Sequence, residues 1–148
     1  MEEYIVNEVY MKPALTLKAA KVISEAAEAE AKKNGLSVAI AITDERGELI
    51  YFVRMDKTTS AAVSIAQKKA FHASYYHRDT VFHENVLAQG NENMAVLSMP
   101  YNMPIEGGLL LEYNGEVIGA IGVSGAMSNE DGQIAEKGRE AFKKLIKE

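Results

Sequence analysis

The sequence contains three histidines, His72, His77 and His83, and no cysteine. Spacings of five and six residues place no two of these histidines on one face of a helix, where an i, i+4 pair would bind zinc. Because no thiolate is available either, the sequence predicts no metal site. His77 stands at the end of a predicted helix, and its main alternative role is a carboxy-terminal cap, where an imidazolium suits the helix dipole.

Lys69 and Arg54 are the candidates for holding an anionic ligand. Arg54 ends a predicted strand, and its planar guanidinium can donate two hydrogen bonds to one carboxylate. Lys69 lies at the flank of a predicted helical stripe, where a lysine either reaches solvent past apolar neighbours or binds an anion. The alternative is an ordinary ion pair with Asp44, Asp56 or Glu106, which would be worth little at the surface.

Glu106 and the glycines that follow it form the remaining candidate site. Glu106 could act as a general base on a small substrate if it were buried close to Lys69. Gly107–Gly108 and Ser124–Gly125 leave backbone accessible near opposite ends of one predicted hairpin, and amide groups near Ser128 could cradle an anion. The alternative is that these glycines only form the bends of the chain.

Two predicted β-hairpins position these residues. Residues 109–113 and 117–123 are apolar and flank Asn114–Gly115, whose residues tolerate the positive φ of a tight turn. Residues 38–43 and 49–54 alternate along their length and are joined by a short turn that ends in glycine. One face of the strand at 38–43 carries only small side chains, which indicates that another element packs closely there.

Three longer helices are predicted. Thr16 caps the first, which Asn34–Gly35 ends. A cap at residues 59–60 precedes the second, which extends to residue 77, and the third begins at Ser128 with a capping box. Because alanine permits close approach, the alanine-lined second helix is expected to lie innermost, on a face of the sheet. Its stripe consists of Val63, Ala66, Ala70, Ala73 and His77.

The rest of the chain is less regular. Residues 78–106 lose clear periodicity, although Thr80 and Asn91 could each cap a short helix, and a long connection of this kind is often functional. Residues 1–14 indicate an extended arm or short edge strand that could pair with another subunit. The order of elements predicts one α+β domain over residues 1–148, with a largely antiparallel sheet flanked by helices.

Composition argues against several classes of partner. A net charge of −5 and a pI near 5.3 oppose general affinity for nucleic acid, which requires clustered basic residues. The apolar runs are too short to span a membrane. The first residues lack the basic region and apolar run of a signal peptide, and the absence of cysteine fits a reducing compartment. We therefore expect a cytoplasmic protein without nucleic-acid or membrane partners.

Several short motifs follow one another along the chain. They are Leu15-Thr16-Leu17 with Ala19-Ala20, Asp44-x-x-Gly47, Arg54-Met55-Asp56, Ile65-Ala66-x-x-Lys69-Ala70, Gly107-Gly108, and the run from Gly115 to Gly125 with Asp131. Together they resemble the GlcG/HbpS family, which includes the carboxy-terminal domain of the propanediol-utilisation protein PduO. The resemblance covers roughly residues 15–147, and the run at 115–125 is its most specific part.

This resemblance implies a profilin-like fold that assembles into oligomers. Several members of the family bind or sense haem, and others accompany glycolate or diol metabolism. Where the family commonly carries a small residue or threonine, this chain has His72, which changes the set of possible ligands. Helical projection places His77 on the alanine stripe and His72 on the far side, so one haem ligand could come from His77, with a methionine, tyrosine or second histidine opposite.

Three functions are compatible with these residues, and binding is favoured over catalysis. The first is an oligomeric protein that holds haem or a small carboxylated metabolite between the helix at 60–77, the irregular segment and the sheet. The second is an enzyme on a small hydroxy- or oxo-acid, and the third is a structural subunit without catalysis. The candidate binding residues are His77, His72, Lys69, Arg54, Gly107, Gly108, Ser124 and Gly125, and the candidate catalytic residues are Lys69 and Glu106.

Overall fold

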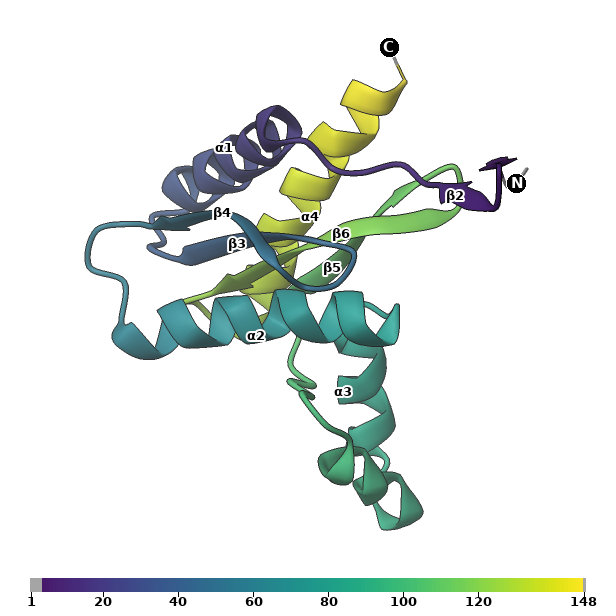
Figure 1. Cartoon of the computed structure of the whole chain (residues 1–148). Helices are drawn as coiled ribbons and strands as arrows, with labels where there is room; N and C mark the ends of the chain where they lie inside the picture. The colour runs from purple at the N-terminus through teal and green to yellow at the C-terminus, as the bar shows by residue number, and fades with distance from the viewer. Residues whose placement is uncertain (1–3, 148) are drawn as a thin grey trace.

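The computed structural model describes residues 4–147, which form an antiparallel sheet flanked by helices (Figure 1). Within these residues the main sheet has four strands in the order β4-β3-β6-β5, and a separate two-stranded sheet precedes it. The predicted α+β, profilin-like fold is confirmed. The elements are β1 (Tyr4–Val6), β2 (Val9–Met11), α1 (Leu17–Lys33), β3 (Ala39–Asp44), β4 (Leu49–Arg54), α2 (Ser60–Tyr76), α3 (Thr80–Ala88), the 3-10 helix η1 (Asn91–Ser98), β5 (Gly108–Tyr113), β6 (Glu116–Ser124) and α4 (Ser128–Ile146).

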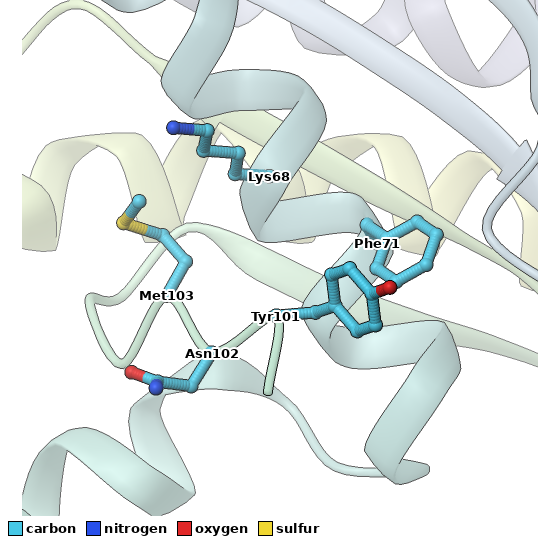
Figure 2. A pocket seen from close by; sticks show the side chains of 5 residues that line it. All are labelled: Lys68, Phe71, Tyr101, Asn102 and Met103. Atoms are coloured by element: carbon cyan, nitrogen blue, oxygen red, sulfur yellow. The ribbon is translucent and has the colours of Figure 1, made fainter. Parts of the chain in front are cut away.

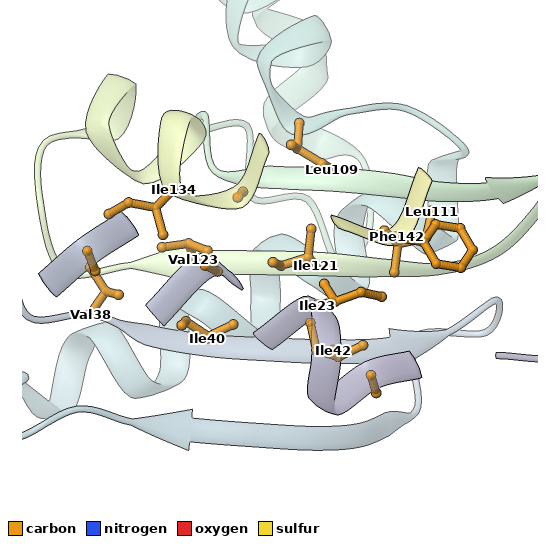
Figure 3. Close-up of a cluster of buried hydrophobic side chains, with 14 of the residues drawn as sticks. Ile23, Val38, Ile40, Ile42, Leu109, Leu111, Ile121, Val123, Ile134 and Phe142 are labelled. Carbon is orange, nitrogen blue, oxygen red and sulfur yellow. The ribbon is translucent and has the colours of Figure 1, made fainter. Parts of the chain in front are cut away.

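The two faces of the sheet carry different cores. Helices α1 and α4 pack against each other and cover one face, whereas α2 lies along the other (Figure 1). Between the sheet and the α1–α4 pair lies the larger cluster, built from branched side chains such as Ile40, Ile42 and Ile121 (Figure 3). The face toward α2 is lined almost entirely by alanines, including Ala39 and Ala41. The predicted small-residue face of the 38–43 strand is therefore confirmed.

Helix α2 and strand β6 come into close contact at Gly122 of β6, which has no side chain. A Cβ atom built on Gly122 would lie 2.0 Å from the carbonyl oxygen of Ala66 and 2.6 Å from the amide nitrogen of Ala70. These are backbone atoms in the middle of a helix, and they cannot shift without moving α2 as a whole. The expectation that the alanine-lined helix packs directly on the sheet is confirmed, and Gly122 is the residue that permits it.

The helix caps agree with the sequence at two positions and differ at a third. The hydroxyls of Thr16 and Thr59 accept hydrogen bonds from backbone amides in the first turns of α1 and α2. At α4 the cap is Met127 rather than Ser128, and the Met127 amide donates to Glu130 Oε1 at 3.1 Å. The prediction that Ser128 is the capping residue is wrong by one position, because the carboxylate of Glu130 accepts from the amide of Met127, the residue before Ser128.

The irregular segment contains more helix than its sequence indicates. Thr80 and Asn91 are the first residues of α3 and η1, after caps at Asp79 and Gly90, so neither is itself the cap. Thr80 instead turns its hydroxyl inward and accepts a hydrogen bond from the Gly108 amide at 2.9 Å. Together α3 and η1 extend away from the body of the domain, below α2 in Figure 1.

The amino-terminal arm is a small hairpin. Of the predicted arm at residues 1–14, residues 1–3 lie outside the described part, and β1 and β2 pair antiparallel in the remainder. Tyr10 and Lys12 attach this hairpin to the domain, through Glu116 Oε1 at 2.8 Å and Glu45 Oε1 at 2.7 Å respectively. No helix within residues 4–147 combines the length and the apolar character needed to cross a membrane.

Gly122→Ala is expected to lower the free energy of unfolding by at least about 3 kcal/mol, because the new methyl group would overlap two backbone atoms of α2. Gly138→Ala is the milder comparison, since its Cβ would lie 2.8 Å from the side-chain tip of Ile121 and no closer than 3.1 Å to a backbone atom, the Ile23 carbonyl oxygen. There the gain in helix propensity, about 1 kcal/mol, offsets the crowding. Urea unfolding of both variants gives the two values, and equal losses would contradict the proposed close contact.

Candidate functional site

A buried ion pair lies where α2, the end of β6 and the start of α4 meet. Lys69 Nζ donates to Asp131 Oδ2 at 3.0 Å and to the Val123 carbonyl oxygen at 2.9 Å. The two side chains are only 2% and 3% exposed. Burial raises the pKa of the Asp131 carboxyl, and the Lys69 ammonium opposes that rise. The expectation that Lys69 lies at a pocket edge is wrong. Of its two predicted roles, reaching solvent or binding an anion, the first is excluded by burial, and the anion that Lys69 meets is a carboxylate of the chain itself.

Two glycines make room for this arrangement. Gly107 has a φ of +131°, and a Cβ atom there would lie 2.8 Å from Lys69 Nζ and 2.6 Å from the Val123 carbonyl oxygen. A Cβ atom on Gly132 would lie 2.2 Å from Glu106 Oε2. Glu106 therefore rests directly on the first turn of α4, next to the buried pair. Lys69 and Glu106 occupy one region of the molecule.

The half-buried Glu106 has an unusual electrostatic setting. Burial raises the pKa of its carboxyl, Glu84 and Asp131 add to the rise, and Lys69 opposes it. Glu106 lines a cleft of about 310 Å³ together with Gly107, Gly132 and residues of α3 and α4. Lys69 does not line this cleft. A carboxyl in such a setting can exchange a proton closer to neutral pH than an exposed glutamate can.

The cation of this cleft is Arg139, which the sequence analysis missed. Its guanidinium lies 3.1 Å from both carboxylate oxygens of Asp79 and 2.7 Å from Glu136 Oε2. Asp79 also accepts the amide of Leu110 at 2.9 Å, which joins α3, α4 and β5. Nothing in the local sequence pairs Arg139 with a residue 60 positions away, so only the fold reveals this network.

Arg54 does not join Lys69. Arg54 is exposed on β4, donates to the carbonyl oxygen of Thr58 at 3.4 Å, and pairs in register with Ala39. Ala39 in turn pairs with Ser124, so β3 separates Arg54 from the end of β6 where Lys69 is bound. The idea that Arg54 and Lys69 share one anion site is therefore not supported by their positions.

The candidate glycine sites lie together rather than apart. Val123 donates its amide to the Gly107 carbonyl oxygen at 2.9 Å, so Gly107–Gly108 and Ser124–Gly125 lie at the same open end of the β5–β6 hairpin. The prediction of opposite ends is wrong, because both pairs lie away from the Asn114–Gly115 turn. Gly107, Gly108 and Ser124 are buried, whereas Gly125 is exposed.

The backbone amides before α4 already have acceptors within the chain. The amide of Ala126 donates to Asp131 Oδ1 at 2.9 Å, and that of Met127 donates to Glu130 Oε1. Carboxylates of the chain itself therefore occupy the two amides that immediately precede Ser128, where the sequence predicted an anion cradle. This also explains why Asp131 stays in place beside Lys69, since its two oxygens are held by different partners.

The histidines occupy positions opposite to those predicted. His77 is exposed in a left-handed conformation with φ 54°, and it is the C-cap residue of α2, where its backbone amide donates to the Ala73 carbonyl oxygen. The predicted position at the end of the helix is confirmed, whereas the interaction of an imidazolium with the helix dipole stays a prediction. His72, expected on the far side of the helix, is fully buried. His72 Nε2 lies 2.9 Å from His83 Nδ1 of α3, and the amide of Met103 donates to His72 Nδ1 at 2.7 Å. Both ring nitrogens of His72 are thus occupied by hydrogen bonds.

Sequence spacing gave no sign of the His72–His83 pair, because the two residues belong to different helices. Burial lowers the pKa of His72 to about 4, with a contribution from His83. Burial and the charge of Arg78 lower the pKa of His83. Both imidazoles are therefore neutral near pH 7. Within residues 4–147 no group of three or more His, Cys, Asp or Glu side chains could hold a metal ion.

A second, more apolar pocket lies between α2 and the segment after η1. It has a volume of about 350 Å³ and is lined by Lys68, Phe71, Tyr101, Asn102 and Met103 (Figure 2). The rings of Phe71 and Tyr101 lie 5.2 Å apart. Among residues 4–147 Lys68 has no ion-pair partner. The pocket forms where the helix and the irregular segment meet, as predicted, but no residue of the sheet lines it.

These features define a profilin-like α+β domain with a pocket on the outer side of its central helix. Residues 15–140 match the family described as haem-degrading HbpS-like proteins, and the chain belongs to this family. Protein GlcG of Escherichia coli strain K12 is 36% identical over 113 residues, which cover 76% of this chain and 83% of that protein.

Solved structures agree with this assignment. A double mutant of HbpS from Streptomyces reticuli superposes with a TM-score of 0.83 at 28% identity, covering 95% of this chain and 94% of that one. The structure described as a PduOC–haem complex superposes with a TM-score of 0.79 at 24% identity, covering 87% of this chain and 95% of that one. At this level of identity the second similarity shows the fold alone.

Lys69→Met is expected to lower the free energy of unfolding by about 3–5 kcal/mol, because it leaves the Asp131 carboxylate buried without its counter-charge. The double variant Lys69→Met/Asp131→Asn should lose less than the sum of the two single variants. Urea unfolding measures all three. Lys137→Met, which removes a half-exposed partner of Glu140, is the control and should change stability by no more than about 0.5 kcal/mol. Equal effects of Lys69→Met and Lys137→Met would contradict a structural role for the buried pair.

Proposed function

We propose that this protein binds a flat, amphipathic small ligand of the haem type in the pocket formed by α2 and residues 101–103. The observation that carries the proposal is the combination of aromatic and thioether walls with one cation at the rim. Phe71, Tyr101 and Met103 supply the apolar surface, and Lys68 supplies the charge. Binding sites for small molecules typically have this composition, with few polar groups that orient an otherwise apolar ligand.

The residues present fit a haem group in chemical terms. Phe71 and Tyr101 can contact the porphyrin face, and the Lys68 ammonium can pair with a propionate. When bound, the haem iron would supply redox and ligand-binding chemistry. Support also comes from the description of the family as haem-degrading. A small carboxylated metabolite could use the same lysine but would leave most of the aromatic surface uncovered.

The proposal includes self-association of the chain. The α3–η1 segment, which precedes the pocket wall at residues 101–103, projects from the body of the domain (Figure 1). Large apolar side chains of η1 and of the pocket wall are in contact with solvent. Met94 is 50% exposed, Leu97 58% and Tyr101 67%. Such a surface is typical of an interface between protein chains. A second copy packed there would cover the open side of the pocket.

Haemin added to the purified full chain is expected to give a saturable shift of the Soret band. Phe71→Ala and Lys68→Ala should each weaken binding roughly tenfold, which corresponds to about 1.4 kcal/mol. Sedimentation of the same samples reports whether the chain self-associates and whether haemin alters this.

Two further variants locate the site. Lys33→Ala removes a lysine from a groove between α1 and α4 and should leave haemin binding unchanged. His77→Ala should also leave it unchanged, because His77 lies in a separate hollow beside the amino-terminal hairpin. Loss of binding in His77→Ala alone would move the site to that hollow, and the absence of any saturable shift would remove haem as the ligand.

The cleft around Glu106 supports a second candidate function, catalysis on a small hydroxy- or oxo-acid. The specific observation is a half-buried carboxyl of raised pKa in a cleft that Arg139 also lines. Glu106 could remove a proton from the carbon next to a substrate carbonyl. Lys69, the other predicted catalytic residue, is held in its buried ion pair and does not line the cleft.

If Glu106 is a general base, the protein should catalyse deuterium exchange at C3 of a three- or four-carbon 2-oxo acid. One-dimensional proton NMR in D₂O measures this exchange. Glu106→Gln should reduce the rate at least about 100-fold, because an amide cannot accept the proton. Glu112→Gln, which changes an exposed glutamate of β5, is the control and should have no effect. Wild-type exchange no faster than in buffer would contradict this candidate.

A further inference from the structure

The hydrogen bonds of the His72–His83 pair have only one possible direction. A backbone amide can only donate, so the contact of 2.7 Å from Met103 N requires His72 Nδ1 to carry no proton. The neutral ring must then carry its proton on Nε2, which lies 2.9 Å from His83 Nδ1. His72 therefore donates to His83, and His83 carries its own proton on Nε2. The chain of donors runs from Met103 through His72 to His83.

Adding one proton to the His72–His83 pair breaks one of the two hydrogen bonds, Met103–His72 or His72–His83. A proton on His72 Nδ1 would face the Met103 amide, and two N–H groups would oppose each other. A proton on His83 Nδ1 would face His72 Nε2–H in the same way. Moving the His72 proton from Nε2 to Nδ1 would let Nε2 accept from His83, but the Nδ1–H would then oppose the Met103 amide. No protonated form of the pair retains both hydrogen bonds.

We propose that His72 and His83 form a proton-operated latch that holds residues 99–105 against α2 at neutral pH and releases them on acidification. These residues include Tyr101, Asn102 and Met103, which form one wall of the apolar pocket. The latch does not depend on the identity of the ligand. Its effect on ligand retention rests on the proposed function.

The groups around the pair disfavour a positive charge in the closed state. From α2, the ring of Tyr76 lies 5.0 Å from that of His72, and from α3 the ring of Phe82 lies 5.1 Å from that of His83. The cation of Arg78, between the two helices, lowers the pKa of His83 further. Glu84 follows His83 in the chain, but the group whose pKa its charge raises is Glu106, and it is not among the groups that shift the pKa of His83. Protonation is therefore resisted until the rings reach water.

The direction of the pH effect follows from this environment. In the closed state burial lowers the pKa of His72 to about 4 from its ordinary value of 6.5. An opened segment exposes the ring, which then takes up a proton at higher pH than the closed form does. As pH falls from about 6.5 toward 4, protons therefore bind preferentially to the open form and favour opening. Above that window both forms are neutral and the segment stays closed.

Other contacts within this segment and between it and α2 must also give way when it opens. The hydroxyl of Tyr76 donates to the carbonyl oxygen of Pro100, and Asn102 Nδ2 donates to the carbonyl oxygen of Met99 at 2.6 Å. The ring of Tyr101 packs beside those of Phe71 and Tyr75, at the exposed edge of α2. None of these contacts involves the sheet or its two cores, so opening of residues 99–105 after loss of the Met103–His72 bond leaves both cores intact.

Hydrogen–deuterium exchange of the full, ligand-free chain tests the latch. After correction for the intrinsic pH dependence of exchange, the opening of residues 99–105 is expected to increase by roughly tenfold or more between pH 7.5 and pH 5. The amide of Ile121 in the core strand β6 is the internal reference and should change far less. His77→Asn is the matched control, because His77 lies outside the pair, and it should behave as the wild type does.

Two variants remove the titration while keeping a hydrogen-bond acceptor. In His72→Asn the side-chain oxygen can replace Nδ1 and accept the Met103 amide, and in His83→Asn it can accept from His72. The double variant should lose the pH dependence of exchange in residues 99–105. A pH dependence that persists in the double variant, or opening in the wild type that does not change with pH, would overturn the proposal.

Nitrogen-15 NMR of the wild-type histidines gives a test that needs no variant. At pH 7.5 both His72 and His83 should show the tautomer protonated at Nε2. A proton on His72 Nδ1 at this pH would overturn the latch even if the variants failed to fold. None of these measurements requires haem, so the latch and the proposed ligand can fail independently. If both hold, haemin should dissociate faster at pH 5 than at pH 7.5 from the wild type but not from the double variant.

Discussion

The close contact between α2 and β6 at Gly122 is the constraint on which the rest of the structure depends. Because Gly122 has no side chain, the backbone of α2 near Ala66 and Ala70 lies directly on the sheet. Close packing of this kind stabilises the domain through many small contacts rather than through large side chains. It also fixes how α2 is rotated about its axis, and this rotation decides where each of its other residues points.

Three sides of α2 then serve three purposes. Its alanines contact the sheet, and Lys69 and His72 point into the fold toward α4 and α3 respectively. Lys68 and Phe71 point outward and form one side of the apolar pocket. Neighbouring residues in the sequence thus have entirely different environments, since successive positions on a helix are about 100° apart. Lys68 and Lys69 show this most clearly, because one is exposed at a pocket and the other is sealed in an ion pair.

The two candidate sites differ in the chemistry they can support. The cleft at Glu106 is polar, contains the Arg139 network and lies over the start of α4. The pocket at Phe71 and Tyr101 is mainly apolar and lies between α2 and residues 101–103. An amphipathic planar ligand fits the apolar pocket better, and family membership agrees with that preference. The buried pair of Lys69 and Asp131 supports both regions without lining either cavity directly, so its role is structural.

The sequence by itself determined the strands, the main helices and the face of the sheet that α2 covers. These features follow from local regularities, such as the turn at Asn114–Gly115 and the alternation of Ile40 and Ile42 with small residues, which the folded chain retains. Only the tertiary structure decided that Lys69 meets Asp131, that His72 meets His83, and that Arg139 meets Asp79. Each of these pairs joins different helices or turns, and the charge or proton that a side chain carries depends on a partner that no local pattern specifies.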